Sequence, residues 1–461
     1  MNKVCDRFIG LLLILSIIVF FHYLLNFEVT VETFMTSEGQ LEWRNKVLWG
    51  SGLLSLFLSI SISLGGEIRE NVSLALISSY LSLFIINIAL ELRDDPDEID
   101  FEQLEAAGIK YDRRSKINVI GDLRNQGINA YSFGKSRYIY QDYFEKTNDI
   151  DPNMVFPLGG ISKVVSVECN ETGEWLIFDS DKFGFNNKDT AYDSIPPDIL
   201  IVGDSFAFGS CVKQSENISG QLQKGGHSVI SMGVTGSGPL SQLATLKEYG
   251  PHLKPKSVVW VYYNGNDLRD LLYEKDVPIL MEYFKKGFSQ NLVSKQKQID
   301  LLWKNFMAKL EKKKKFGVLK PDSFFTRNNI KNIIVLMNIR KLLGLHPKTL
   351  LHTNMVAEKS TLDLFKSILM ESKASLAKWG GNFYFVFLPG RAKKNPGSQA
   401  NYKNVKKIVK ELDIPFIDFQ KHLFSMKDPD SFFPFRKRKV HYNPEGYKLL
   451  ADFISKEAFG K

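Results

Sequence analysis

Three long apolar runs near the start of the chain constrain its fold more than any other feature. They extend from Phe8 to Phe27, Val47 to Leu64 and Val72 to Leu92, with almost no charge in their interiors. Each approaches the roughly 20 residues that a helix needs to cross a bilayer. A cleaved signal peptide would explain the first run only. The sequence therefore predicts a cell-membrane protein with three transmembrane helices in the bilayer; buried core helices are the alternative.

The charges that flank these runs predict an orientation. Basic residues lie before the first run and between the second and third: Lys3, Arg7 and Arg69. The segment after the third run is acidic, from Glu91 to Asp100. Because basic flanks stay in the cytoplasm, we expect the amino terminus inside and the large remainder outside. Arg44 and Lys46, before the second run, weigh against this orientation.

The net charge of +9 does not indicate nucleic-acid binding. Between Lys285 and Lys320 there are eleven lysines and two acidic residues, so this segment alone accounts for the excess. It contains no arginine and no recognisable nucleic-acid-binding motif. We expect a solvated or membrane-facing patch, and no nucleic-acid partner.

The remaining chain shows the rhythm of an α/β protein. Residues 1–95 form the predicted membrane region, 96–196 a connecting segment, and 197–461 a domain of apolar strands alternating with helical patterns. Near-continuous apolar strands indicate a parallel sheet covered by helices on both faces. The predicted strands are Ile199–Val202, His227–Gly233, Ser257–Tyr263, Phe383–Leu388 and Ile414–Phe419.

The spacing between these strands is regular except once. About a hundred residues, approximately 270–375, separate the third strand from the fourth, which is far beyond an ordinary connection. Apolar residues from Leu292 to Leu310 recur at helical spacing. We therefore predict a helical insertion that packs on the sheet, lies in the membrane interface or caps the site.

Polar and glycine residues follow the strands where a parallel sheet gathers its reacting groups. Ser205 follows the first strand, Gly233 the second and Asn266 the third, while His441 precedes the terminal helix. Each feature alone is ordinary, since a serine before a helix is usually a cap and a glycine-rich loop is usually a turn. Their order at the strand ends indicates one site.

Together these four blocks resemble the SGNH (GDSL-like) hydrolase family from about Ile199 to Phe459, apart from the insertion. The resemblance implies a flavodoxin-like three-layer parallel sheet, with Ser205 as the nucleophile and His441 as the base. It also implies an oxyanion hole formed by the N–H groups of Ser205 and Gly233 and the Asn266 amide, and no cofactor or metal.

Two positions depart from the family pattern. Asn264 stands where the third block usually has glycine, and Arg438 stands where the family has the aspartate that precedes the histidine. The third triad member orients the imidazole and stabilises its charged form. A carboxylate from elsewhere, a backbone carbonyl or no group at all could take this place; the candidate acids are Asp430, Asp428 and Asp181.

Two of the three cysteines, Cys169 and Cys211, lie in the part predicted to be outside the cytoplasm. An oxidising compartment permits a disulfide between them, and two unrelated free thiols are the alternative.

The resemblance and the predicted location lead to a functional hypothesis. We expect a serine esterase or O-acyltransferase that acts through an acyl-enzyme at Ser205 on a small ester or an acylated cell-envelope glycan. A catalytically inactive envelope protein that binds glycan or a partner enzyme is the alternative. A lipid esterase that uses the basic insertion to sit on anionic membrane is a third possibility.

Overall fold

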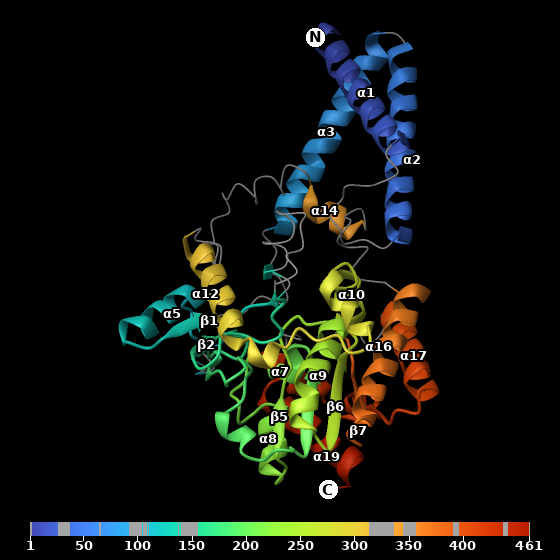
Figure 1. Ribbon diagram of the computed structural model, residues 1–461. Coiled ribbons are helices and arrows are strands. Elements are labelled where there is room, and N and C mark those ends of the chain that lie inside the picture. The colour runs from blue at the N-terminus through green and yellow to red at the C-terminus, as the bar shows by residue number, and fades with distance from the viewer. Residues whose placement is uncertain are drawn as a thin grey trace. The chain divides into compact units, whose positions relative to one another are not determined.

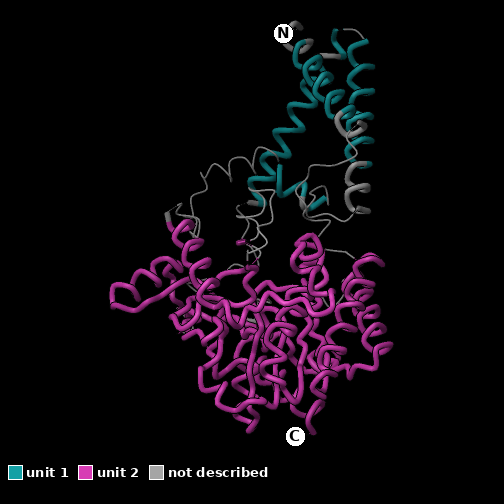
Figure 2. Tube along the Cα trace, viewed as in Figure 1, with its two compact units in different colours: residues 1–98, 322–355 teal, residues 99–321, 356–461 magenta. Residues whose placement is uncertain are grey.

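The computed structural model describes residues 2–25, 37–63, 66–91, 104, 108, 110–136, 138–139, 155–312, 336–343, 356–390, 396–436 and 441–460. The chain divides into two compact units (Figure 2). One unit comprises residues 1–98 and 322–355, and the other comprises residues 99–321 and 356–461. Part of the predicted insertion therefore belongs to the same unit as the amino-terminal helices.

The described part of the first unit is helical, and many of its apolar side chains are exposed. Its elements are α1 (Asn2–Leu25), α2 (Ser37–Ser63), α3 (Gly66–Glu91) and α14 (Met337–Leu342). Two stretches are long and apolar enough to cross a membrane, Asn45–Ser63 and Gly66–Leu90, whereas the apolar stretch of α1 that the structure describes is shorter, Arg7–Phe21. Leu53 and Ile85 on these helices are 62% and 65% exposed. Three membrane crossings and their orientation stay predictions.

The short helix α14 comes from the insertion and packs against α3. The side-chain oxygen of Asn87 accepts hydrogen bonds from the backbone N–H groups of Asn338, at 2.9 Å, and Ile339, at 3.3 Å. Asn87 is fully buried, so this polar side chain is satisfied by the start of α14.

The second unit is built on a five-stranded parallel sheet in the order β5-β4-β6-β7-β8. In sequence the strands are β4 (Ile199–Gly203), β5 (Val229–Ser231), β6 (Ser257–Tyr263), β7 (Asn382–Leu388) and β8 (Phe416–Asp418). This 2-1-3-4-5 order is that of flavodoxin-like doubly wound folds. The predicted fold class is confirmed.

Helices cover both faces of this sheet (Figure 1). Side chains alternate along β4, so Leu200 and Val202 enter one hydrophobic core while Ile199 and Ile201 enter the other. The first core contains side chains of α9 (Pro239–Leu253), α16 (Lys359–Ala377) and α17 (Pro396–Glu411). The second contains those of α8 (Ile218–Lys224), α18 (Phe419–Ser425) and α19 (Pro444–Phe459).

A second, smaller sheet precedes the large one in the chain. It consists of β1 (Ala130–Ser132), β2 (Val165–Val167) and β3 (Ile177–Asp179), with β1 and β2 parallel and β2 and β3 antiparallel. Phe133 and Phe178 pack on Phe208, with ring centroids 4.7 and 5.5 Å away. Because Phe208 ends α7 (Ser205–Phe208), the helix that follows β4, the connecting segment is packed directly onto the region that Ser205 begins.

The described part of the insertion within the second unit is mainly helical, as the sequence predicts. Trp303 of α12 (Gln296–Lys312) is buried and donates its indole N–H to the Gly159 carbonyl at 2.8 Å. The remaining helices of this unit are α5 (Lys116–Asn125), α10 (Asp267–Glu274), α11 (Pro278–Met281) and α12 (Gln296–Lys312). Short 3-10 turns are η1 (Asp189–Tyr192), η2 (Glu282–Phe284), η3 (Leu292–Ser294), η4 (Pro429–Phe432) and η5 (Pro434–Arg436).

Candidate active site

Ser205 begins the helical turn that follows β4. A side chain at Gly203 would place its Cβ 2.6 Å from the Val261 carbonyl oxygen, so only glycine fits where the strand turns into α7. The carboxylate of Asp204 caps α7 by accepting the Phe206 N–H at 3.0 Å. The Ser205 carbonyl then accepts the N–H groups of Gly209 and Ser210. These local contacts fix the backbone of Ser205.

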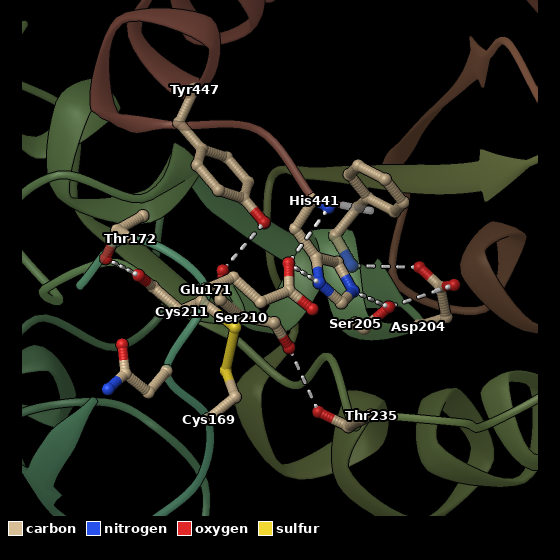
Figure 3. A network of polar contacts seen from close by, with 12 residues as sticks. Cys169, Glu171, Thr172, Asp204, Ser205, Ser210, Cys211, Thr235, His441 and Tyr447 are labelled. Carbon is tan, nitrogen blue, oxygen red and sulfur yellow. Dashed lines mark hydrogen bonds and ion pairs between the residues drawn. A yellow bond between two sulfur atoms is a disulfide. The ribbon is translucent and has the colours of Figure 1, made fainter. Parts of the chain in front are cut away.

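His441 meets the Ser205 hydroxyl from the far end of the chain (Figure 3). Its Nε2 lies 2.9 Å from Ser205 Oγ, although the two residues are 236 positions apart. His441 lies two residues before Asn443, which caps α19 by accepting the Gly446 N–H at 2.9 Å. Asn443 also donates its amide to the Ser431 carbonyl at 2.8 Å. The cap thus holds the loop that carries the imidazole.

The carboxylate at the other imidazole nitrogen belongs to Glu171 (Figure 3). Its Oε2 lies 3.0 Å from His441 Nδ1 and accepts the His441 backbone N–H at 3.2 Å. With Nδ1 protonated and donating to Glu171, Nε2 is free to accept the proton of the Ser205 hydroxyl. Ser205, His441 and Glu171 therefore form one continuous hydrogen-bonded line.

This placement corrects the expectation that an aspartate supplies the acid. Nδ1 has one proton to donate and Glu171 receives it, so Asp181, Asp428 and Asp430 do not have that role. Asp181 is buried among its own partners, Tyr192 Oη at 2.7 Å and Asn187 Nδ2 at 2.8 Å. Burial raises its pKa to about 6 despite these hydrogen bonds.

The other two aspartates lie in the segment before the histidine. Asp428 caps η4, where its carbonyl accepts the Ser431 hydroxyl at 2.6 Å. Asp430, within η4, lines a pocket beside Phe206 and Tyr442. Arg438, which occupies the family's usual aspartate position, lies outside the described residues.

The charges around His441 favour its protonated form. Burial lowers the pKa of the imidazole, but the Glu171 charge and hydrogen bond outweigh burial, with smaller contributions from Glu168 and Asp204. The net pKa lies above the ordinary 6.5. An imidazole whose pKa is raised in this way is a stronger base for the Ser205 proton.

The two predicted oxyanion residues lie beside the nucleophile's turn. Asn266 is the N-cap residue of α10, donates its amide to Asp270 Oδ2 at 2.8 Å and lowers the pKa of the nearby Asp204 carboxyl. Gly233 packs so closely on α7 that a Cβ there would lie 2.3 Å from the Phe208 nitrogen. The structure thus brings both residues next to the elements that hold Ser205.

Asp204 links the nucleophile to this second group of residues. Its Oδ2 lies 3.4 Å from Ser205 Oγ, and burial raises its pKa to about 6. Burial also raises the pKa of Asp267, which the Asp204 charge raises further, while Asp267 accepts the Tyr263 N–H at 2.8 Å. These buried carboxylates fix the loops at the carboxyl ends of β4 and β6.

The two cysteines are joined in a disulfide between Cys169 and Cys211, with Cα atoms 5.2 Å apart. Cys169 lies two residues before Glu171, and Cys211 follows the turn that closes α7. This pairing is also the one sequence signal that could have located Glu171. A Cys169–Cys211 bond would bring residues near 171 close to the serine turn, although nothing in the local sequence marks Glu171 as catalytic.

An aromatic pocket of about 160 Å³ lies beside Ser205 and His441. Phe206 and Tyr442, the residues that follow Ser205 and His441, are both in its lining. The Phe206 ring lies 5.1 Å from the His441 ring, centroid to centroid. Tyr263, Phe424 and Phe433 complete its aromatic walls.

No protein-family model and no curated protein matches the sequence. Solved structures to which the chain is similar include TesA, at 11% identity and a TM-score of 0.31, covering 57% of this chain and 98% of that one. A putative lipolytic protein of the G-D-S-L family from Desulfitobacterium hafniense DCB-2 matches at 14% identity and a TM-score of 0.28, covering 56% and 97%. A catalytic mutant of an acetylxylan esterase from Geobacillus stearothermophilus matches at 13% and 0.30, covering 58% and 95%.

Proposed function

We propose that the chain is a serine ester hydrolase or O-acyltransferase with Ser205 as nucleophile, His441 as base and Glu171 as the acid that orients His441. One observation carries the proposal: the line from Ser205 Oγ to His441 Nε2 at 2.9 Å and from His441 Nδ1 to Glu171 Oε2 at 3.0 Å. A nucleophile within hydrogen-bond reach of a base that is itself held by a third group is the arrangement that covalent acyl transfer needs.

The reaction would proceed in two halves. Ser205 Oγ attacks the ester carbonyl carbon while His441 Nε2 takes the hydroxyl proton. The tetrahedral intermediate collapses, the alcohol leaves with the proton from His441, and the acyl group stays on Ser205. In the second half His441 takes a proton from the incoming hydroxyl, which attacks the acyl-enzyme; when this second intermediate collapses, the acyl product leaves and His441 returns the proton to Ser205 Oγ. Water as that nucleophile gives hydrolysis, and a sugar hydroxyl gives transfer.

The negative oxygen of each intermediate needs hydrogen-bond donors. The backbone N–H groups of Ser205 and Gly233 and the amide of Asn266 are proposed for this role, supported by the packing of Gly233 on α7 and by the influence of Asn266 on the Asp204 carboxyl beside Ser205. Donors already fixed before reaction stabilise developing charge at low cost. Asn266 would exchange a carboxylate partner for the oxyanion.

The location favours an ester of the cell envelope as substrate. The two helices that meet the length of a membrane span support attachment to a bilayer, and the disulfide supports an oxidising, extracytoplasmic compartment for the second unit. A domain held there would meet acylated glycans of the envelope. An acylated glycan is therefore the proposed substrate or acceptor, and acetyl is the acyl group to test first.

The test uses the full-length protein in detergent with a chromogenic acetyl ester. We expect hydrolysis by the wild type, loss in Ser205→Ala and in His441→Ala, and no change in Ser294→Ala, an exposed serine that serves as the matched control. Adding an oligosaccharide acceptor and measuring the ratio of acetylated sugar to free acetate separates transfer from hydrolysis. Equal rates in Ser205→Ala and wild type would contradict the proposal and favour a non-enzymatic binding protein.

A further inference from the structure

We propose that the Cys169–Cys211 disulfide is a positioning element of the catalytic site: it holds Glu171 against His441, so reduction of this bond lowers activity by releasing the acid. The inference rests on the proposed function, because it concerns the same triad. It makes activity depend on the oxidised state of this bond, and it assigns a positioning role to two cysteines outside the triad.

The position of Glu171 creates the need for such an element. It lies between β2, which ends at Val167, and β3, which begins at Ile177, on neither strand. Its side chain reaches His441 from a connection that the large sheet does not carry. A loop without regular structure has many conformations, and holding one of them costs entropy.

The disulfide links the Glu171 loop covalently to the segment that follows α7. One end is Cys169, two residues before Glu171. The other is Cys211, directly after Ser210, whose backbone N–H donates to the Ser205 carbonyl at 3.0 Å. A covalent link limits the loop to conformations near the nucleophile's turn.

Most non-covalent contacts of the same loop lie within the small sheet, are exposed or lead away from Ser205. Thr172 donates its hydroxyl to the Cys211 carbonyl at 3.0 Å, beside the disulfide (Figure 3). The Lys213–Glu174 ion pair, at 3.0 Å, is between side chains 67% and 71% exposed, so it adds little. Asn170 instead bonds the Asp112 carbonyl, which leads away from Ser205. The disulfide is therefore the strongest described link from this loop to the serine turn.

The Cys211 side of this link is itself firmly held, so the link transmits position. Cys211 is 2% exposed, and the preceding Ser210 is bonded by its hydroxyl to Thr235 at 3.2 Å and by its carbonyl to the Tyr447 hydroxyl at 3.4 Å (Figure 3). Tyr447 is fully buried in α19, the helix that follows His441. The anchor for the Glu171 loop thus belongs to the same packed structure as the base.

A reductant can reach the bond. Cys169 is only partly buried, and a groove of about 430 Å³ has Cys211, Thr172 and Glu174 in its lining. A small thiol or a thiol reductase that presents an extended active-site cysteine could therefore attack the pair. Reduction would leave two thiols in place of the link.

Freed thiols introduce a second effect that the experiment must exclude. Ligand atoms of Glu171, Cys211 and His441 lie within 4.8 Å of one another, and sulfur, imidazole and carboxylate together suit zinc. Adventitious Zn²⁺ could occupy His441 in the reduced protein. EDTA is therefore present in every assay.

The experiment compares four full-length proteins: wild type, Cys169→Ser/Cys211→Ser, Glu171→Gln and the triple variant. Each is assayed on the acetyl ester across pH, with wild type and Glu171→Gln also measured after reduction. We expect reduction or the cysteine replacements to lower kcat on the order of 10²-fold, the cost of a misplaced catalytic group. We expect reoxidation of the wild type to restore the rate.

The pH profile separates positioning from mere stabilisation. Without Glu171 nearby, burial dominates and the His441 pKa falls, so the acid limb of kcat/KM moves to lower pH. The same move is expected in the reduced wild type and in the cysteine variant. In the Glu171→Gln variant, reduction should change neither kcat nor the pH of the acid limb of kcat/KM, because the carboxylate is already lost.

Two outcomes would overturn the inference: a reduced wild type with unchanged rate and limb, or equal loss on reduction with and without Glu171. Thermal melting shows whether the cysteine variant remains folded, and reduction of the already folded wild type is the second route if it does not.

A readout independent of activity is modification of His441 by diethylpyrocarbonate, quantified by peptide mass spectrometry across pH. If no protein hydrolyses the ester, the proposed function fails, yet a lowered His441 pKa in the cysteine variant would still support the positioning role, and an unchanged one would overturn it.

Discussion

The members of the candidate triad come from two regions with different structural character. Ser205 and His441 belong to the large α/β unit, one at the end of β4 and the other before α19, and both positions follow from regular elements packed on a hydrophobic core. Glu171 comes from the small sheet's connection and is held by tertiary and covalent links. The comparison teaches that regular elements can position a nucleophile and base, whereas the acid depends on contacts made by a loop.

The largest effect is expected for Ser205 and His441. Ser205→Ala should lower kcat by about four orders of magnitude or more, because no other hydroxyl takes its place on the acyl group. His441→Ala should match it, and the double variant should be no worse than either single one, since the two residues act as a unit. Steady-state kinetics on the acetyl ester measure this. Additive losses in the double variant would contradict a shared step.

The next largest effect is expected at Glu171, the candidate acid between β2 and β3. Glu171→Gln should lower kcat by roughly 10³-fold and shift the acid limb of the pH profile downward, because the carboxylate is what raises the His441 pKa. The sign follows from burial, which lowers that pKa once the negative charge is gone. The matched control is Asp428→Asn, which should keep both rate and limb. A full rate in Glu171→Gln would remove the acid from the account.

A smaller loss is expected at the oxyanion donor of the large sheet. Asn266→Ala should lower kcat by about 10²-fold with little change in KM, as removal of one donor does elsewhere. Asn264→Ala is the comparison, because its amide donates to the Ser398 carbonyl at 2.9 Å and hydroxyl at 2.8 Å. If Asn264→Ala lost more activity than Asn266→Ala, the assignment of the donor would be wrong.

A stability prediction concerns Gly184, in the segment between β3 of the small sheet and β4 of the large one. Gly184 has a φ of +79°, and a Cβ there would lie 2.1 Å from the Gly160 carbonyl oxygen. Gly184→Ala should therefore destabilise the second unit by more than the roughly 1–2 kcal/mol that the left-handed conformation alone costs. Gly226→Ala is the control, since Gly226 has a φ of +86° and open space around it. Thermal unfolding of both variants tests this prediction. Similar melting temperatures for the two variants would contradict it.

The smallest effect is expected at the exposed ion pair of the Glu171 loop. Lys213→Ala should change stability by less than about 1 kcal/mol and leave kcat unchanged, because both partners are largely exposed. Melting temperature and steady-state rate measure this. A loss comparable to that of the cysteine variant would mean that the ion pair, rather than the disulfide, holds the loop.

The same contrast explains how much the sequence could predict. The sequence predicts β6 with the bounds it has, Ser257–Tyr263, because the six consecutive apolar or aromatic side chains that follow Ser257 are typical of a central parallel strand. Ser205 and His441 could be located because each adjoins a strand or a helix cap with its own local pattern. The parallel α/β sheet followed from the strand pattern, and the flavodoxin-like class from the resemblance of the four blocks to the SGNH hydrolase family.

Glu171 could not be located in this way. Its neighbours in the chain form no pattern that marks a catalytic carboxylate, and its contact with His441 spans 270 residues. Arg438 in place of the aspartate near His441 left open whether another carboxylate, a backbone carbonyl or no group at all faces the imidazole. Asp428 and Asp430 were candidates because they lie upstream of His441, and Asp181 because it lies in the segment before the large sheet. The partner that the structure shows is set instead by the packing of the small sheet on Phe208 and by the disulfide.

The most direct test of the central claim is the site of covalent labelling by a fluorophosphonate. After reaction with the full-length protein, peptide mass spectrometry should find the adduct on Ser205 in the wild type, a strongly slowed reaction in His441→Ala and Glu171→Gln, and none in Ser205→Ala. An adduct on another serine, or equal labelling of Ser205 with and without His441, would contradict a hydroxyl activated by that imidazole.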